Sequence, residues 1–296
     1  MQNSGSRSAE RPGAERRGRV RQAVLALCAV GMVASQRAAA QLLVDPLEVT
    51  LFTTSANRVA ASFTVSNTTD APVQATITRQ DWDRVENGDN RFLPAGTSGT
   101  SCGAILTASP LSIRVEPHTS HTVRVGVQNA ADLKKECWDI FFVEEIPQRP
   151  TVKGNSLQYI FRTGVKVYVA PSGLARDGAI EDMAVEDVPL TPHAASSTPS
   201  KLAANGAPST KRQIAIRFHN TGGMNLIAKG RLEFRRLDNS LAASTPLPEF
   251  PTLPGAVRKL MVDVPPGLTA GDYVVLALID FGGAELVAGQ IDYQAK

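Results

Sequence analysis

The chain has 296 residues, which is enough for two domains of ordinary size and too many for one immunoglobulin-sized sandwich. Hydrophobic residues make up 43% and charged residues 20% of the chain, a composition typical of globular proteins rather than of disordered or membrane-spanning ones. The formal net charge of +3 gives no support to nucleic-acid binding, because that function needs a concentrated basic face.

The first forty residues have the order of a secretory signal peptide. Four arginines between positions 16 and 21 precede a short apolar run at 23–34, and three alanines at 38–40 come just before Gln41. This order predicts export, with cleavage after Ala40. The apolar run is shorter than the roughly 20 residues that span a bilayer. The segment carries seven arginines and two glutamates, so its removal changes the net charge from +3 to −2.

The cysteines divide between the signal segment and the exported chain. Cys28 lies in the apolar run and leaves with it, whereas Cys102 and Cys137 remain as an even pair. An even pair in an exported chain predicts a disulfide, and two free buried thiols are the alternative. A closed loop of about 35 residues contributes about 3–4 kcal/mol on the loop-entropy model.

From residue 41 onward, the sequence predicts short β-strands separated by turns, with no long stretch of helical period. Turn-forming residues gather at 66–70 and 116–119, and a boundary falls at 170–173. The strands expected before this boundary are 60–65, 73–78, 112–115, 122–127, 140–143 and 157–169.

A second set of strands is expected after the boundary, at 213–218, 226–234, 257–264 and 273–280. The stretch 189–210 is rich in Pro, Ser, Thr and Ala, so we expect a mobile surface insertion there. The segment FTVSNT at 63–68 is echoed by IRFHNT at 216–221. The predicted fold is therefore all-β, with two immunoglobulin-like β-sandwich domains in tandem at 41–170 and 171–296.

Four blocks in order resemble the periplasmic chaperones of pilus (fimbrial) subunits, of the chaperone–usher type. They are VSN at 65–67, LSIRVEP at 111–117 with VRV at 123–125, FFVEEIP at 141–147 and LQYIFRTGVKVY at 157–168. The second half matches more loosely, at LPG (253–255) and LTAGDY (268–273). The resemblance implies a periplasmic chaperone that stabilises incomplete β-sandwich subunits by donating a strand to them.

The resemblance assigns roles to particular residues. Lys166 falls where the family has a lysine that binds the C-terminal carboxylate of the subunit. Leu157, Tyr159 and Phe161 fall on the alternating residues of the donor strand. Strand spacing, and not the resemblance, places Arg162 on the face of Lys166, too far away to bind the same carboxylate but able to steer its approach. One departure is that the first strand, PLEVTLF at 46–52, has no arginine where the family has one beside the lysine.

Without the resemblance, the same residues allow purely structural interpretations. Three alternating apolar residues are usually the inner face of a strand, and a lone lysine in an apolar strand usually lies along the solvent face. An exported structural or adhesive protein of tandem sandwiches, without chaperone activity, is therefore the alternative function.

An enzyme is not expected. His118 and His121 have no further ligands nearby in the sequence, and Glu144 and Glu145 point to opposite faces of a strand, so neither pair makes a metal or acid–base site. We predict no catalytic residues, no metal and no cofactor. The partners implied are exported pilin-like β-sandwich subunits and an outer-membrane usher, with no nucleic acid and no small-molecule substrate.

Overall fold

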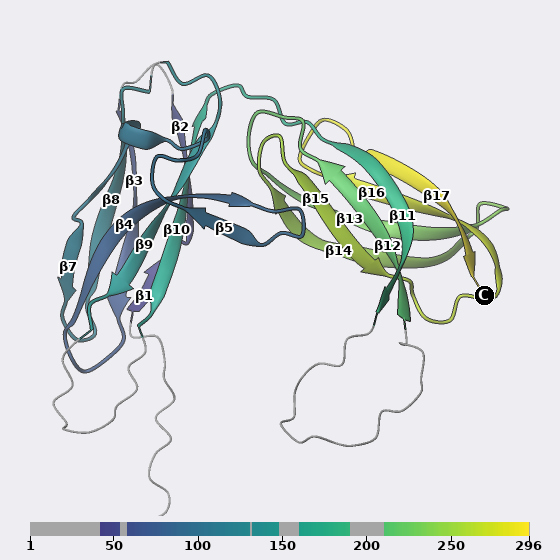
Figure 1. Ribbon diagram of the computed structural model, residues 1–296, viewed down its shortest axis with the longest axis horizontal. Coiled ribbons are helices and arrows are strands. Elements are labelled where there is room, and N and C mark those ends of the chain that lie inside the picture. Colours follow the sequence, from purple (N-terminus) through teal and green to yellow (C-terminus); the bar gives the residue numbers. More distant parts are fainter. Residues whose placement is uncertain (1–41, 54–57, 131, 148–159, 190–209, 296) are drawn as a thin grey trace, which may run out of the picture. The chain divides into compact units, whose positions relative to one another are not determined.

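The computed structural model describes residues 42–53, 58–130, 132–147, 160–189 and 210–295. These residues form seventeen β-strands and one short 3-10 helix, with no α-helix among them (Figure 1). No helix in this part of the chain has the length and apolar character needed to cross a membrane. The all-β prediction is confirmed, whereas the signal peptide at 1–40 with its cleavage after Ala40, and the inner part of the expected insertion at 190–209, lie outside the described residues.

The first sandwich contains two sheets, drawn from purple to teal in Figure 1. One sheet has the strand order β1-β3-β8-β6, and the other has the order β2-β10-β9-β4-β5, with β7 paired to β4. The strands are β1 (Leu42–Asp45), β2 (Glu48–Thr53), β3 (Arg58–Asn67), β4 (Val73–Arg84), β5 (Asn90–Leu93), β6 (Leu106–Ser109), β7 (Ser112–Val115), β8 (Ser120–Gln128), β9 (Cys137–Glu145) and β10 (Arg162–Pro171). The 3-10 helix, η1, spans Gly103–Ile105.

Alternating side chains set the inner faces of these sheets. In β8, Val123, Val125 and Val127 are buried in the core, while the residues between them face outward. Strand β9 is different, because eight of its nine residues are buried. It lies between β10 and β4 and is covered on both faces, which is why its sequence contains a continuous apolar run.

The second sandwich contains a three-stranded sheet, β11-β12-β15, and a four-stranded sheet, β14-β13-β16-β17. Its strands are β11 (Ala179–Pro189), β12 (Thr210–His219), β13 (Leu226–Arg236), β14 (Leu241–Thr252), β15 (Val257–Asp263), β16 (Gly271–Asp280) and β17 (Val287–Ala295). Strand β14 lies at a sheet edge and contains Pro246, Pro248 and Pro251. Proline has no N–H to donate, so these residues protect the edge from pairing with another chain.

Each sandwich has its own hydrophobic core. The first core is built from residues between Leu42 and Val169, and the second from residues between Ile214 and Ala295. The predicted fold class of two tandem immunoglobulin-like sandwiches is therefore confirmed. The domain bounds 41–170 and 171–296 stay a prediction.

The two similar segments, FTVSNT at 63–68 and IRFHNT at 216–221, make the same arrangement of hydrogen bonds in the two sandwiches. The Asn67 side-chain amide donates to the carbonyl oxygens of Ala71 (2.7 Å) and Val115 (3.0 Å). In the second sandwich, the Asn220 amide donates to the carbonyl oxygens of Met224 (3.0 Å) and Thr252 (2.9 Å). Each side-chain oxygen also accepts from the backbone N–H two residues later. Related asparagines thus close the same kind of turn in both sandwiches.

We expect Asn220→Ala to lower the free energy of unfolding by about 2–4 kcal/mol, because the buried carbonyl oxygens of Met224 and Thr252 would each lose a donor. Urea denaturation followed by circular dichroism measures the change. Asn87→Ala is the control, since that exposed amide bonds only to Asp89 and its loss should cost less than about 0.5 kcal/mol. Equal stability of the two variants would contradict the prediction.

The predicted disulfide between Cys102 and Cys137 is present, with Cα atoms 5.0 Å apart. It joins the segment that follows β5 to the start of β9. Nearby, the buried Asp81 carboxylate accepts hydrogen bonds from the backbone N–H groups of Gly96, Thr97 and Ser98 at 2.7–3.0 Å. Burial by itself raises the pKa of Asp81, but these bonds together with one from the Ser101 hydroxyl lower it. The disulfide and this carboxylate hold the 94–102 segment against the sheet.

Candidate functional site

One of the two edges of β10 is paired with a neighbouring strand over only part of its length. On one side, β10 pairs antiparallel with β9 from Arg162 to Val169. On the other side it pairs in parallel with β2, and that ladder begins only at Lys166. The first contact on this side is the backbone N–H of Lys166, which donates to the Leu47 carbonyl oxygen at 2.8 Å. Among the described residues, positions 162–165 therefore have a strand on one side only.

The two faces of β10 have different surroundings. Val165, Val167 and Val169 are fully buried in the core of the first sandwich. Phe161 has the same parity and is half-buried, whereas Ile160 is 54% exposed. The strand was predicted to span 157–169, but β10 begins at Arg162, so Ile160 and Phe161 lie before it. Leu157 and Tyr159 lie outside the described residues.

Lys166 lies on the opposite face of β10 from those valines, and it is already paired. Its Nζ is 3.1 Å from Glu48 Oε1 and 4.8 Å from the ring centroid of Trp82. Glu48 is also the residue directly opposite Lys166 in the β2–β10 register. The lysine side chain is 16% exposed and that of Glu48 is 45% exposed. A carboxylate that binds Lys166 must therefore share it with Glu48 or displace Glu48.

Arg162 is held by its own sheet. Its Nε is 3.2 Å from Glu144 Oε2, and its guanidinium carbon lies 3.6 Å from the ring centroid of Phe142. The side chain is 36% exposed. The structure thus places both predicted cations in ion pairs, Lys166 with Glu48 and Arg162 with Glu144.

A buried aromatic cluster lies on the outer face of the β2–β10–β9–β4 sheet. Trp82, Trp138, Ile140, Phe142 and Tyr168 belong to it, and Leu253 of the second sandwich packs with them. The Trp138 indole N–H donates to the Trp82 carbonyl oxygen at 2.8 Å. Burial raises the pKa of the Tyr168 hydroxyl, with the nearby Glu48 carboxylate acting in the same direction. The strand patterns in the sequence give no sign of this cluster, because its aromatic members come from three different strands.

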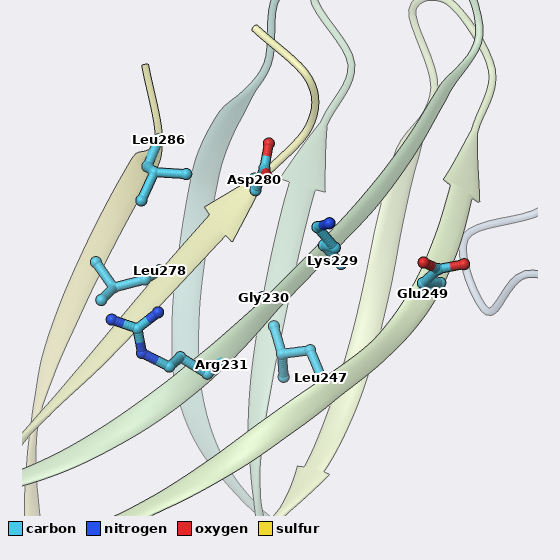
Figure 2. Close-up of a pocket in the computed structure, with 8 residues that line it drawn as sticks. All are labelled: Lys229, Gly230, Arg231, Leu247, Glu249, Leu278, Asp280 and Leu286. Carbon is cyan, nitrogen blue, oxygen red and sulfur yellow. The ribbon is translucent and has the colours of Figure 1, made fainter. Parts of the chain in front are cut away.

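A hollow on the second sandwich is lined by a mixture of charged and apolar side chains. Figure 2 shows side chains from β13, β14 and β16 around it, together with Leu286. Its lining is Lys229, Gly230, Arg231, Leu247, Glu249, Leu278, Asp280 and Leu286. Gly230 is required by the close approach of β16, since a Cβ there would be 2.2 Å from the Leu278 carbonyl oxygen. The described residues also contain no cluster of three His, Cys, Asp or Glu side chains suited to a metal.

These features define an all-β protein of two sandwiches, in which the described part of β10 has a partly open edge. Residues 46–175 match the family described as "Pili and flagellar-assembly chaperone, PapD N-terminal domain". This match covers the first sandwich, so that part of the chain is similar to the pilus-chaperone family. No curated protein has a significantly similar sequence.

Several solved structures are similar in fold at low sequence identity. The class 5 fimbriae chaperone CfaA has 10% identity and a TM-score of 0.48, with 84% of this chain and 98% of that one covered. The CupB2 chaperone of Pseudomonas aeruginosa has 14% identity and a TM-score of 0.42, with 86% and 100% covered. The CsuC–CsuE chaperone–tip adhesion subunit complex of Acinetobacter baumannii has 13% identity and a TM-score of 0.43, with 86% and 98% covered.

Proposed function

We propose that the protein is a periplasmic chaperone that binds exported pilin-like β-sandwich subunits by donating the strand that leads into β10. The observation that carries the proposal is the edge of β10 at 162–165, where the described residues place a strand on one side only. An unpaired edge offers backbone donors and acceptors to a second chain, so a protein normally covers it unless a partner uses it.

The donated side chains would be Leu157, Tyr159 and Phe161. These positions continue the odd-numbered row that contains Val165, Val167 and Val169, and Phe161 is half-buried at the end of the described row. A subunit that lacks its own final strand has a groove that accepts such a row. Each large apolar side chain buried there contributes about 1.5–3 kcal/mol, while the backbone bonds set direction and register.

Lys166 is the proposed ligand of the subunit's C-terminal carboxylate, and Arg162 the residue that steers its approach. Lys166 stands where the one-sided edge ends, beside the first residues of β2. A chain end that arrives along the edge would therefore meet the ammonium group. Its low exposure strengthens the attraction to a carboxylate, which must compete with Glu48.

The proposal is tested by co-expressing the chain with a candidate pilin-like subunit and measuring the yield of the purified complex. Leu157→Glu and Phe161→Glu should each reduce the yield at least about tenfold, because a carboxylate in an apolar groove costs more than 1.4 kcal/mol. Lys166→Ala should reduce it less. Ile160→Glu is the matched control, since its exposed side chain has the opposite parity and the complex should persist.

Unchanged yield in all three test variants would refute the donor-strand proposal. Such a result would favour the exported structural or adhesive protein instead.

A further inference from the structure

A half-buried serine hydroxyl, that of Ser101, lies between two fully buried carboxyl groups of the first sandwich. Its Oγ is 2.8 Å from Asp81 Oδ1 on β4 and 3.0 Å from Asp139 Oδ1 on β9. A hydroxyl group has one proton, so Ser101 can donate to only one of the two carboxyl groups at a time. The other contact therefore needs a proton that the second carboxyl group supplies.

Asp81 has the surroundings of an ionised carboxylate. Its two oxygens accept hydrogen bonds from the backbone N–H groups of Gly96, Thr97 and Ser98 at 2.7–3.0 Å. Such bonds favour the charged form, and together they lower the pKa of Asp81 although burial raises it. The Ser101 hydroxyl proton therefore points to Asp81, where it is a further donor to the negative charge.

Asp139 is the carboxyl group that supplies the second proton. Its Oδ2 is buried and has no hydrogen-bond partner among the described residues, and Arg79 Nε lies 3.7 Å from it. A proton on Oδ1 has the Ser101 Oγ as its acceptor, whereas a proton on Oδ2 would have none. The three groups thus form a directed chain, from the Asp139 acid through the Ser101 hydroxyl to the Asp81 carboxylate.

The elements around Asp139 leave its protonation to burial and to this chain. Burial is the largest effect on the pKa of Asp139 and raises it to about 7. On β4, Arg79 lowers this pKa and Asp81 raises it, while the backbone N–H of Cys102 lowers it. On β10, the residue directly opposite Asp139 is the buried Val167, which has no charge. The proton is therefore lost as the pH rises through about 7.

We propose that protonation of Asp139 controls whether the 94–102 segment stays attached to β4 and β9. Without that proton, two carboxylates face a single hydroxyl, which can donate to only one of them, and they repel each other across it. The hold of Asp81 on the backbone of the segment weakens as a result. The segment then separates from the sheet locally, while the Cys102–Cys137 disulfide keeps one of its ends attached.

Hydrogen exchange of the Gly96, Thr97 and Ser98 amides tests the proposal in the chain from residue 41 onward. Corrected for the intrinsic effect of pH, their protection should fall at least about tenfold between about pH 5 and about pH 8. At the higher pH, low concentrations of urea should leave their exchange unchanged, because local opening exposes little surface. The Val125 amide in the core should instead exchange faster with urea, since its opening follows global unfolding.

Two isosteric variants test the direction of the chain. Asp139→Asn keeps a donor for Ser101 and cannot ionise, so the protection of the three amides should stay high at both pH values. Asp81→Asn removes the charged acceptor, so the protection should be low at both pH values. Asp132→Asn, at an exposed carboxyl, is the matched control and should follow the wild type.

Equal protection of the wild type at the two pH values would overturn the proposal. So would a wild-type pH dependence in Asp139→Asn, or a urea dependence of the three amides equal to that of Val125. High protection in Asp81→Asn at both pH values would reverse the chain and overturn the assignment of the proton to Asp139. If Asp81→Asn does not fold, the wild type and Asp139→Asn decide the question.

Discussion

Replacing both Cys102 and Cys137 by alanine is expected to lower the free energy of unfolding of the first sandwich by about 3–4 kcal/mol. The bond closes a loop across a sequence separation of 35 residues, and its loss restores freedom to the unfolded chain. Both residues are buried, and alanine keeps part of their apolar contact. Guanidinium denaturation of the oxidised wild type, the reduced wild type and the double variant measures the effect.

The reduced wild type serves as the internal control for the alanine side chains. It should unfold close to the double variant and well below the oxidised protein. Identical midpoints for the oxidised and reduced wild type would contradict the expected stabilisation.

Asp139 is expected to make the protein less stable as the pH rises. Its side chain is fully buried on β9, and burial raises its pKa to about 7 from the ordinary 3.8, against the opposing effects of the Ser101 hydroxyl and Arg79. Between about pH 3.8 and about pH 7, the folded chain therefore binds more protons than the unfolded chain does. The free energy of unfolding therefore falls as the pH rises through this interval and levels off above about 7.

Asp139→Asn should remove this contribution. Between pH 5 and pH 8 we expect the wild type to lose about 2–3 kcal/mol more stability than the variant does. Urea denaturation at the two pH values measures the difference. Asp132→Asn, at an exposed carboxyl, should follow the wild type. The same pH dependence in Asp139→Asn and the wild type would rule out Asp139 as the source.

Strands whose signal is local are well predicted from the sequence. Strand β8 alternates buried valines with outward residues, and β9 shows as a continuous apolar run, so both were expected at nearly their observed places. The disulfide followed from an even pair of cysteines in an exported chain, and the structure confirms it.

Strand β14 was missed for a physical reason. Its three prolines argue against a strand in any sequence-based prediction, since each removes a ladder donor. The strand forms because it pairs on one side only, with β13, and an edge position tolerates proline. Whether a strand lies at an edge depends on the arrangement of the whole sheet, so the local sequence pattern does not predict it.

The candidate site could be predicted only in part. The place of Lys166 in a strand was expected, but its pairing with Glu48 joins residues 118 positions apart in the chain. That contact depends on the register of β2 against β10, which no local pattern specifies. The same holds for Trp82 of β4, whose ring lies next to Lys166 of β10.

The parallel pairing of β2 with β10 also limits how far the strand of a bound partner could pair along the edge of β10. Because β2 occupies that side of β10 from Lys166 onward, any strand that adds to the edge is blocked at this residue by the backbone of Leu47 and Glu48. The residue at which β2 begins therefore sets how far a partner strand can extend along β10. Moving that starting point along the chain would change the length of the foreign segment that the protein can cover, without altering any side chain on β10.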